Sequence, residues 1–193
     1  DWHYTPFLYI GGERSIGVPY TIKNPDCEID AVIGGTIDRV DIKDGTINIV
    51  DYKTGRSSKE TKTSLDNVFA NEITSAGNRL QAFLYSVILD DLLNGKRVAG
   101  KGDFEWIAKV KAQPARKISP SLLYIHTPED TQRENFIIDV LKEPVTDIKT
   151  IKEEYLLKLD EVLRDIFDIK KPFTPVDDAK KCEFCDYRKI CGK

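Results

Sequence analysis

The stretch from Gly34 to Gly55 reads GGTIDRVDIKDGTINIVDYKTG and is the most informative part of the chain. Two runs rich in valine, isoleucine and threonine flank Lys43, Asp44 and Gly45. An Asp-Gly pair between two such runs is typical of the tight turn of a β-hairpin. We therefore predict two antiparallel strands that fold back on each other at this turn.

The second predicted strand carries an acid and a lysine on one face. Side chains alternate between the two faces of a strand, so Asp51 and Lys53 lie on the same side. Asp38 belongs to the partner strand, and the hairpin return brings it within reach of Asp51. Two carboxylates are the hard oxygen ligands that Mg²⁺ (or Mn²⁺) prefers. Lys53 beside such a metal would orient or deprotonate an attacking water, or neutralise charge on a phosphoryl oxygen.

The alternative for these residues is purely structural. A strand that ends in Asp-Tyr-Lys is ordinary at a sheet edge, and Asp38 with Arg39 would form a solvated ion pair. The spacing Asp-x-Lys has little specificity by itself. The combination of Gly-x-x-Asp, a hairpin turn and an apolar strand that runs into Asp-x-Lys favours the catalytic interpretation.

At these segments the sequence resembles the PD-(D/E)xK nucleases, and within them the RecB/AddB group of bacterial helicase-nucleases. GGTIDRVD contains Asp38, IVDYKTG contains Asp51 and Lys53, and LQAFLYSVIL carries Gln81 and Tyr85 in a Gln-x-x-x-Tyr pattern. The resemblance implies an α/β fold with a restriction-endonuclease-like core, a central mixed β-sheet flanked by α-helices. It implies that all five residues are catalytic and that Asp38 and Asp51 bind Mg²⁺ or Mn²⁺.

The same resemblance implies the function and the partners. The expected activity is hydrolysis of phosphodiester bonds by a metal-dependent DNA exonuclease domain of a helicase-nuclease that acts in double-strand-break repair and recombination. DNA and a helicase motor subunit or domain are the expected partners. Two alternatives stay open: an inactive nuclease fold that serves as a DNA-binding or interaction scaffold, and a small adaptor with a zinc ribbon. The intact set of five residues favours the nuclease.

Composition limits the remaining possibilities. The chain has 193 residues, 40% of them hydrophobic and 32% charged, which suits a single globular domain over residues 1–193 with a cysteine-rich tail at 176–193. No apolar run approaches the length of a membrane span, so a cytoplasmic location is expected. The chain lacks methionine and is expected to be part of a longer one, and the resemblance implies that an upstream helix outside this chain supplies a His or Glu ligand to the metal. Within the chain, Glu13 is expected to be a surface carboxylate, and His3 lies near a terminus, where fraying is common, so neither is expected to be this ligand.

Charge gives little support for binding to nucleic acid through bulk electrostatics. The formal net charge is −3 and the isoelectric point is about 5.5. The run from Lys109 to Lys117 is either a local basic patch or a solvated loop.

Apolar spacing predicts the other elements. A helix is expected over Asn78–Leu93, where Gln81 and Tyr85 share a face that either lines the core or approaches the metal site. An amphipathic helix is expected over Asp147–Asp168. Arg56–Asn71 is expected to be a loop. In it, Ser57, Ser58 and Lys59 either contact a phosphate backbone or belong to a plain flexible loop. Strands are expected around Ile107–Val110, Leu122–His126 and Phe136–Val140.

Three cysteines close the chain with the spacing C-x2-C-x5-C. They are Cys182, Cys185 and Cys191, and such clustering favours a metal over disulfides in a cytosolic protein. Zinc and iron–sulfur sites take thiolates in sets of four, so one ligand is missing. The spacing is similar to part of the iron–sulfur staple of AddB and of the CRISPR adaptation nucleases, which implies a 4Fe–4S cluster in the full-length protein, incomplete in this fragment. Cys27 is expected to be a bystander; free thiols are the alternative.

Overall fold

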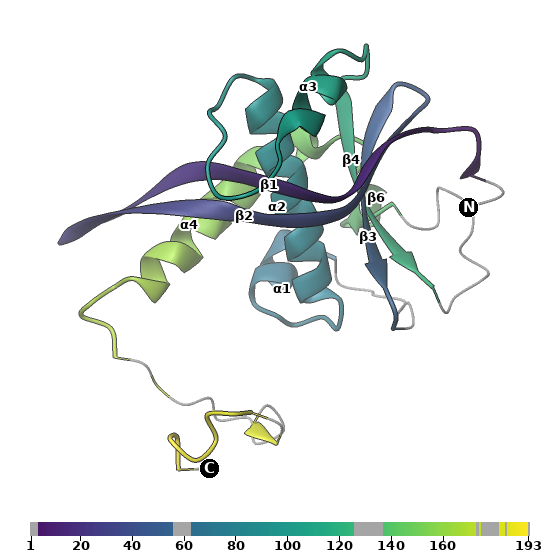
Figure 1. The fold of residues 1–193 in the computed structure, drawn as a ribbon. Coiled ribbons are helices and arrows are strands. Elements are labelled where there is room, and N and C mark those ends of the chain that lie inside the picture. Colours follow the sequence, from purple (N-terminus) through teal and green to yellow (C-terminus); the bar gives the residue numbers. More distant parts are fainter. Residues whose placement is uncertain are drawn as a thin grey trace.

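The centre of the molecule is a four-stranded mixed sheet (Figure 1). The computed structural model describes residues 4–55, 63–125, 137–172, 174, 182–183 and 185–192. The strands lie in the order β1–β2–β3–β4; β2 is antiparallel to both β1 and β3, and β4 is parallel to β3. Their bounds are β1 (Leu8–Asn24), β2 (Cys27–Lys43), β3 (Thr46–Lys53) and β4 (Lys117–Tyr124). The mixed α/β sheet expected from the sequence is confirmed.

The turn between β2 and β3 has the geometry that its sequence predicts. Lys43 pairs with Thr46, and the two residues between them, Asp44 and Gly45, have φ angles of 49° and 72°. Positive φ at both central positions is required by the turn type that matches the twist of a hairpin, and Asp-Gly tolerates it well. The predicted hairpin is therefore confirmed.

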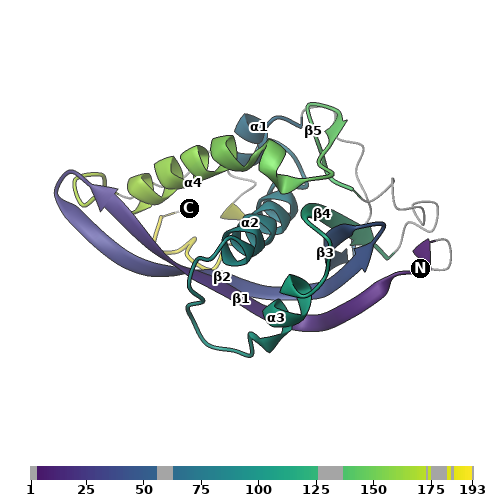
Figure 2. The same ribbon diagram turned by 90° about the horizontal axis from the view of Figure 1, so that it is seen from above.

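Helix α2 (Ala76–Leu93) is the longest helix of the connection between β3 and β4, and it lies between the sheet and the last helix (Figures 1 and 2). Because it is covered on both sides, it buries apolar residues such as Phe83 and Leu89. The last helix, α4 (Lys152–Ile166), packs on its outer side, where the Tyr155 hydroxyl donates to the Leu80 carbonyl at 2.9 Å. Both helices lie where the apolar spacing predicts them, α4 after a short 3-10 turn, η4 (Ile148–Thr150).

Two shorter helices differ from the sequence-based expectation. The segment Ile107–Val110, expected to be a strand, belongs to α3 (Glu105–Lys111), because Trp106, Ile107 and Val110 bury one side at helical spacing. The expected loop Arg56–Asn71 contains α1 (Leu65–Phe69). It begins at Ser64, whose hydroxyl accepts from the backbone N–H of Asn67 at 3.3 Å. The expected phosphate contacts Ser57, Ser58 and Lys59 lie outside the described residues.

The segments around β4 and after it agree with the expectation in part. β4 begins at Lys117, five residues before the expected start at Leu122, and His126 lies outside the described residues. A small second sheet pairs β5 (Asp139–Val140) with β6 (Glu143–Pro144). Of the expected strand Phe136–Val140, Ile137 forms an isolated β-bridge with Ser121, Asp139–Val140 form β5, and Phe136 lies outside the described residues. None of the helices in the described ranges combines the length and apolarity needed to cross a bilayer.

Candidate active site

Asp51 is a buried acid near the carboxyl end of β3. Its side chain forms an ion pair with the Lys53 ammonium, two residues further along the same face of the strand. Burial raises the pKa of Asp51, the hydrogen bond and charge of Lys53 oppose this rise, and the negative charge of Asp38 adds to it. The structure thus places an acid and a lysine together as the strand period predicts.

Asp38 meets the same segment from the neighbouring strand. One of its carboxylate oxygens, Oδ2, accepts a hydrogen bond from the backbone N–H of Tyr52 at 2.7 Å. Its negative charge adds to the raised pKa of Asp51, and Asp38 and Asp51 each stand one residue beyond the paired Arg39 and Val50 on the two neighbouring strands. The hairpin return brings Asp38 within reach of Asp51, as expected.

Helix α2 adds Gln81 and Tyr85 to this group. The Lys53 ammonium donates to Oε1 of Gln81 at 3.3 Å, and Nε2 of Gln81 donates to the hydroxyl of Tyr85 at 3.0 Å. A continuous polar chain therefore runs from Asp51 through Lys53 and Gln81 to Tyr85. All the residues that the sequence nominates for catalysis lie in one cluster.

Gly35 makes room for the end of that chain. A Cβ atom on Gly35 would lie 2.4 Å from the Tyr85 hydroxyl oxygen, a distance that real Cβ atoms do not reach. The glycine three residues before Asp38 therefore allows the phenol of Tyr85 to lie directly against β2. Sequence reasoning noted this glycine only as part of the motif.

The opposite face of the hairpin carries a buried ion pair. Arg39 Nε lies 3.0 Å from Asp41 Oδ2, and the two side chains are 5% and 0% exposed. Asp41 also accepts hydrogen bonds from the hydroxyl of Tyr4 at 2.6 Å and from the amide of Asn48 at 2.9 Å. The partner of Arg39 is therefore a buried Asp41, and the solvated Asp38–Arg39 pair considered as an alternative is wrong.

Arg39 also braces the strand segment that carries the candidate site. Its Nη1 donates to the hydroxyl of Tyr52 at 2.8 Å, and its guanidinium lies 5.5 Å from the centre of the Tyr52 ring. Tyr52 stands between Asp51 and Lys53 in the sequence. Sequence reasoning missed this supporting role, because only the register of the two strands shows that Arg39 and Tyr52 share a face.

The donor set fits a divalent metal that prefers oxygen. Asp38 and Asp51 offer carboxylate oxygens, and in the described ranges no three His, Cys, Asp or Glu side chains gather into a larger ligand group. Mg²⁺ commonly takes one or two protein carboxylates and keeps waters or substrate phosphates in its other positions. Glu13 is an exposed residue of β1, as expected, and His3 lies outside the described residues.

The C-terminal cysteines do not form a ready-made cluster. Cys182 is buried, Cys185 is half-buried and Cys191 is exposed, and all three are free thiols in the turns beyond the end of α4 (Figure 1). Among the residues with described positions, they do not assemble with one another or with Cys27 into a set of three ligands. The iron–sulfur cluster therefore stays a prediction.

The basic run Lys109–Lys117 joins the end of α3 to the start of β4. It starts within α3, and Arg116 donates through Nη1 to the carbonyls of Gln113 and Ala115 at 2.6 and 2.7 Å. The solvated-loop alternative therefore holds only between Lys111 and Lys117, and the basic-patch alternative stays a prediction.

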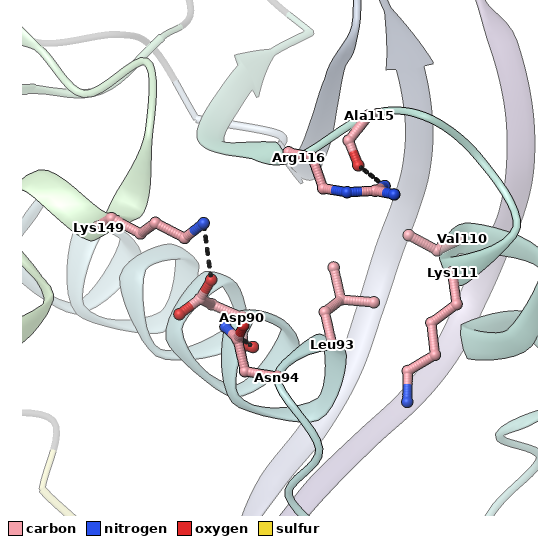
Figure 3. Close-up of a pocket in the computed structure, with 8 residues that line it drawn as sticks. All are labelled: Asp90, Leu93, Asn94, Val110, Lys111, Ala115, Arg116 and Lys149. Atoms are coloured by element: carbon pink, nitrogen blue, oxygen red, sulfur yellow. Dashed lines mark hydrogen bonds and ion pairs between the residues drawn. The ribbon is translucent and has the colours of Figure 1, made fainter.

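Arg116 also lines a hollow of about 350 Å³ at the far end of α2 (Figure 3). Asp90 at its wall is 3.7 Å from Lys149 and 2.6 Å from Lys152, so its charge is compensated inside the fold. Asp90 follows Gln81 by nine residues in the sequence, about 13 Å along the helix axis. The hollow is therefore separate from the candidate active site.

The comparison with protein families agrees with the geometry. A model of the PD-(D/E)XK nuclease superfamily matches residues 5–192, nearly the whole chain. Comparisons with curated proteins and with solved structures found no significant match. The mixed sheet with its flanking helices is consistent with the restriction-endonuclease-like core of this superfamily, whose members are nucleases that generally use divalent metals such as Mg²⁺. The chain belongs to the PD-(D/E)XK nuclease superfamily.

Proposed function

We propose that this chain is a divalent-metal-dependent deoxyribonuclease that hydrolyses phosphodiester bonds at the cluster of Asp38, Asp51, Lys53, Gln81 and Tyr85. The observation that carries the proposal is the position of the Lys53 ammonium, which is shared between the Asp51 carboxylate and the Gln81 amide. A lysine held in this way stands beside the two acids that suit a metal.

Asp38 and Asp51 would hold the metal. When bound, the metal supplies a Lewis acid that polarises a phosphoryl oxygen and favours deprotonation of a water. Asp51 is suited to this task because burial raises its pKa. The ionised carboxylate is destabilised by burial, and a cation nearby would stabilise it. Asp38 is held in place by the Tyr52 backbone.

Lys53 acts as a cation at the reacting phosphate. Its ion pair with Asp51 favours an electrostatic role over that of a general base, because a protonated amine cannot accept a proton. It orients the attacking water or compensates negative charge that develops on the phosphoryl oxygens. Water then forms the new bond to phosphorus and gives up a proton to the solvent, while the bond from phosphorus to the leaving sugar oxygen breaks and that oxygen takes up a proton.

Gln81 and Tyr85 hold Lys53 in position and do not bind the metal. Both are uncharged, and their hydrogen bonds fix Lys53 from the side of α2. Without the amide oxygen of Gln81, the ammonium would lose a partner that holds it beside Asp51.

We extend the proposal to an exonuclease domain of a RecB/AddB-type helicase-nuclease that acts on DNA during break repair. The support is the sequence pattern, in which the Asp38 motif, the Asp51–Lys53 motif and the Gln81–Tyr85 pair follow one another in the order typical of that group. The helicase motor would be a partner outside this chain.

Metal-dependent cleavage of labelled DNA tests the proposal. The protein is incubated with single- and double-stranded substrates, with open or blocked ends, in Mg²⁺, in Mn²⁺ and with a chelator. We expect cleavage that requires the metal and that blocked ends suppress. Cleavage that persists in the chelator would contradict the metal assignment, and cleavage of circular DNA would contradict the exonuclease assignment.

A further inference from the structure

A pocket of about 250 Å³ adjoins the candidate active site. It opens where three segments meet at one edge of the sheet: the end of β3, the start of α2 and the end of β4. Its lining includes Lys53 and Thr54 from the first, Thr74, Ser75 and Asn78 from the second, and Tyr124 from the third.

Lys53 belongs to both the pocket and the candidate active site. Its ammonium contacts Asp51 and Gln81, and the same side chain lines the pocket. Asn78 precedes Gln81 by one helical turn, so the two side chains lie on the same face of α2. A ligand in the pocket would therefore be directly next to a phosphate held at the active site.

The walls of the pocket are fixed by the fold. The hydroxyl of Ser75 accepts from Nε of Arg79 at 2.8 Å, and Arg79 pairs with Asp139 at 3.3 Å. On the other wall, Tyr124 lies in register with Lys53 on the neighbouring strand and is half-buried against the core. The pocket is thus formed before any ligand arrives, which lowers the entropy cost of binding.

The chemistry of the lining selects the ligand. Among the lining residues that the structure describes, one is a cation, several offer hydroxyl or amide groups, one is an aromatic phenol and none is a carboxylate. This combination suits an anionic phosphate joined to an uncharged, planar ring that forms hydrogen bonds. The hollow in Figure 3 differs in this respect, because Asp90 lines it.

We infer that this pocket binds one unpaired nucleotide next to the scissile phosphate, with its base against the ring of Tyr124 and its polar edge at Asn78. The inference rests on the proposed nuclease function and adds a substrate class: single-stranded DNA or a frayed end. A base in a Watson–Crick pair cannot enter, because its partner strand would have to enter with it.

The test combines a protein change with a substrate change. Cleavage of single-stranded DNA is measured for the wild type, Tyr124→Ala, Tyr124→Phe and, as a control, Tyr187→Ala, which removes an exposed tyrosine of the C-terminal turns. Tyr124→Ala should lower kcat/KM about 5- to 150-fold, the range expected for one stacked base. Tyr124→Phe, which keeps the aromatic ring, should lose much less than Tyr124→Ala, and Tyr187→Ala should stay near the wild type. One abasic residue beside the scissile phosphate should cause a similar loss in the wild type and no further loss in Tyr124→Ala. Additive losses, or an unchanged Tyr124→Ala, overturn the inference.

A binding measurement separates this inference from the proposed function. The fluorescent base 2-aminopurine is placed at successive positions of an oligonucleotide and its quenching by the protein is recorded. The pocket is supported if the fluorescence is quenched at a single position and if this quenching is abolished by Tyr124→Ala and weakened by Asn78→Ala. This holds even if no DNA is cleaved, because a lack of cleavage would contradict only the proposed nuclease function. Cleavage with uniform quenching along the strand overturns the pocket and leaves the nuclease intact. Thermal unfolding of each variant shows whether it is folded. If Tyr124→Ala is unfolded, the quenching measured with Asn78→Ala decides whether the pocket binds the base.

Discussion

The carboxylate of Asp38 accepts a hydrogen bond from the backbone N–H of Tyr52 at 2.7 Å. Tyr52 separates Asp51 from Lys53, so this bond ties the first acidic motif to the second through the main chain. On the other face of the hairpin, Arg39 donates to the Tyr52 hydroxyl at 2.8 Å. The relative position of the two motifs is therefore held from both sides of one residue.

Replacement of Arg39 should destabilise the fold strongly. Arg39→Met leaves the buried carboxylate of Asp41 without its cation, and removal of one partner of a buried ion pair typically costs about 3–5 kcal/mol. Tyr52→Phe removes only the hydrogen bond from Arg39 and should cost about 1 kcal/mol. Urea unfolding followed by circular dichroism gives both values. Equal stability of Arg39→Met and the wild type would show that this ion pair does not hold the hairpin.

The raised pKa of Asp51 predicts how stability depends on pH. Burial is the main cause, so the protonated acid is favoured in the folded state, and its stabilising contribution is complete below the ordinary value of 3.8 and is lost as the pH rises through the raised pKa. Asp51→Asn should therefore become increasingly more stable than the wild type as the pH rises through that window, when no metal is present. Urea unfolding at a series of pH values, with a chelator, measures this difference. A difference that shrinks with rising pH would mean that the pKa is lowered instead.

Gly35→Ala should affect the site through Tyr85. The new methyl group would collide with the phenol oxygen, so Tyr85 must move and the hydrogen bond from Gln81 is lost. We expect Gly35→Ala and Tyr85→Phe both to reduce cleavage while metal affinity, measured by calorimetry, stays close to that of the wild type. Gly77→Ala is the matched control, because a Cβ atom there meets nothing within 4 Å. Loss of metal affinity in folded Tyr85→Phe would assign the phenol to the metal site.

The cysteines of the tail should bind metal incompletely in this chain alone. A 4Fe–4S cluster takes four thiolates, the tail supplies three, and Cys27 stands at the start of β2. Anaerobic purification followed by iron, sulfide and zinc analysis should give substoichiometric metal that falls in Cys182→Ser and is unchanged in Cys27→Ser. A full complement of iron that depends on Cys27 would contradict this assignment, and stoichiometric zinc without iron would replace the cluster with a zinc site.

Sequence reasoning found the parts of the site that depend on local rules. The Asp-Gly turn and the two-residue period of β3 place Asp51 and Lys53 together, and the helical period places Gln81 near Tyr85. It failed where a short segment has an ambiguous period: Ile107–Val110 suits a strand or a helix, and only the burial of Trp106 with it decides for α3.

Contacts between residues on neighbouring strands could not be predicted from the sequence, because they depend on the register of the strands. The pairing of Arg39 with Asp41 and Tyr52 depends on which residues of β2 and β3 face each other. The pocket at Tyr124 depends on the parallel register of β3 and β4, which are separated by three helices in the sequence. Such registers are set by the packing of the whole domain and by no local pattern.

The decisive measurement for the proposed active site is the cleavage of labelled DNA by Asp51→Asn, compared with the wild type and with Asp44→Asn. Asp44→Asn makes the same chemical change in the same hairpin, at a turn position where asparagine tolerates positive φ. In Mg²⁺ we predict that the wild type and Asp44→Asn cleave at similar rates. Asp51→Asn should cleave at least about 100-fold more slowly, as expected when a metal ligand and its electrostatic contribution are removed. Cleavage by Asp51→Asn at the rate of the wild type would contradict the assignment of the active site.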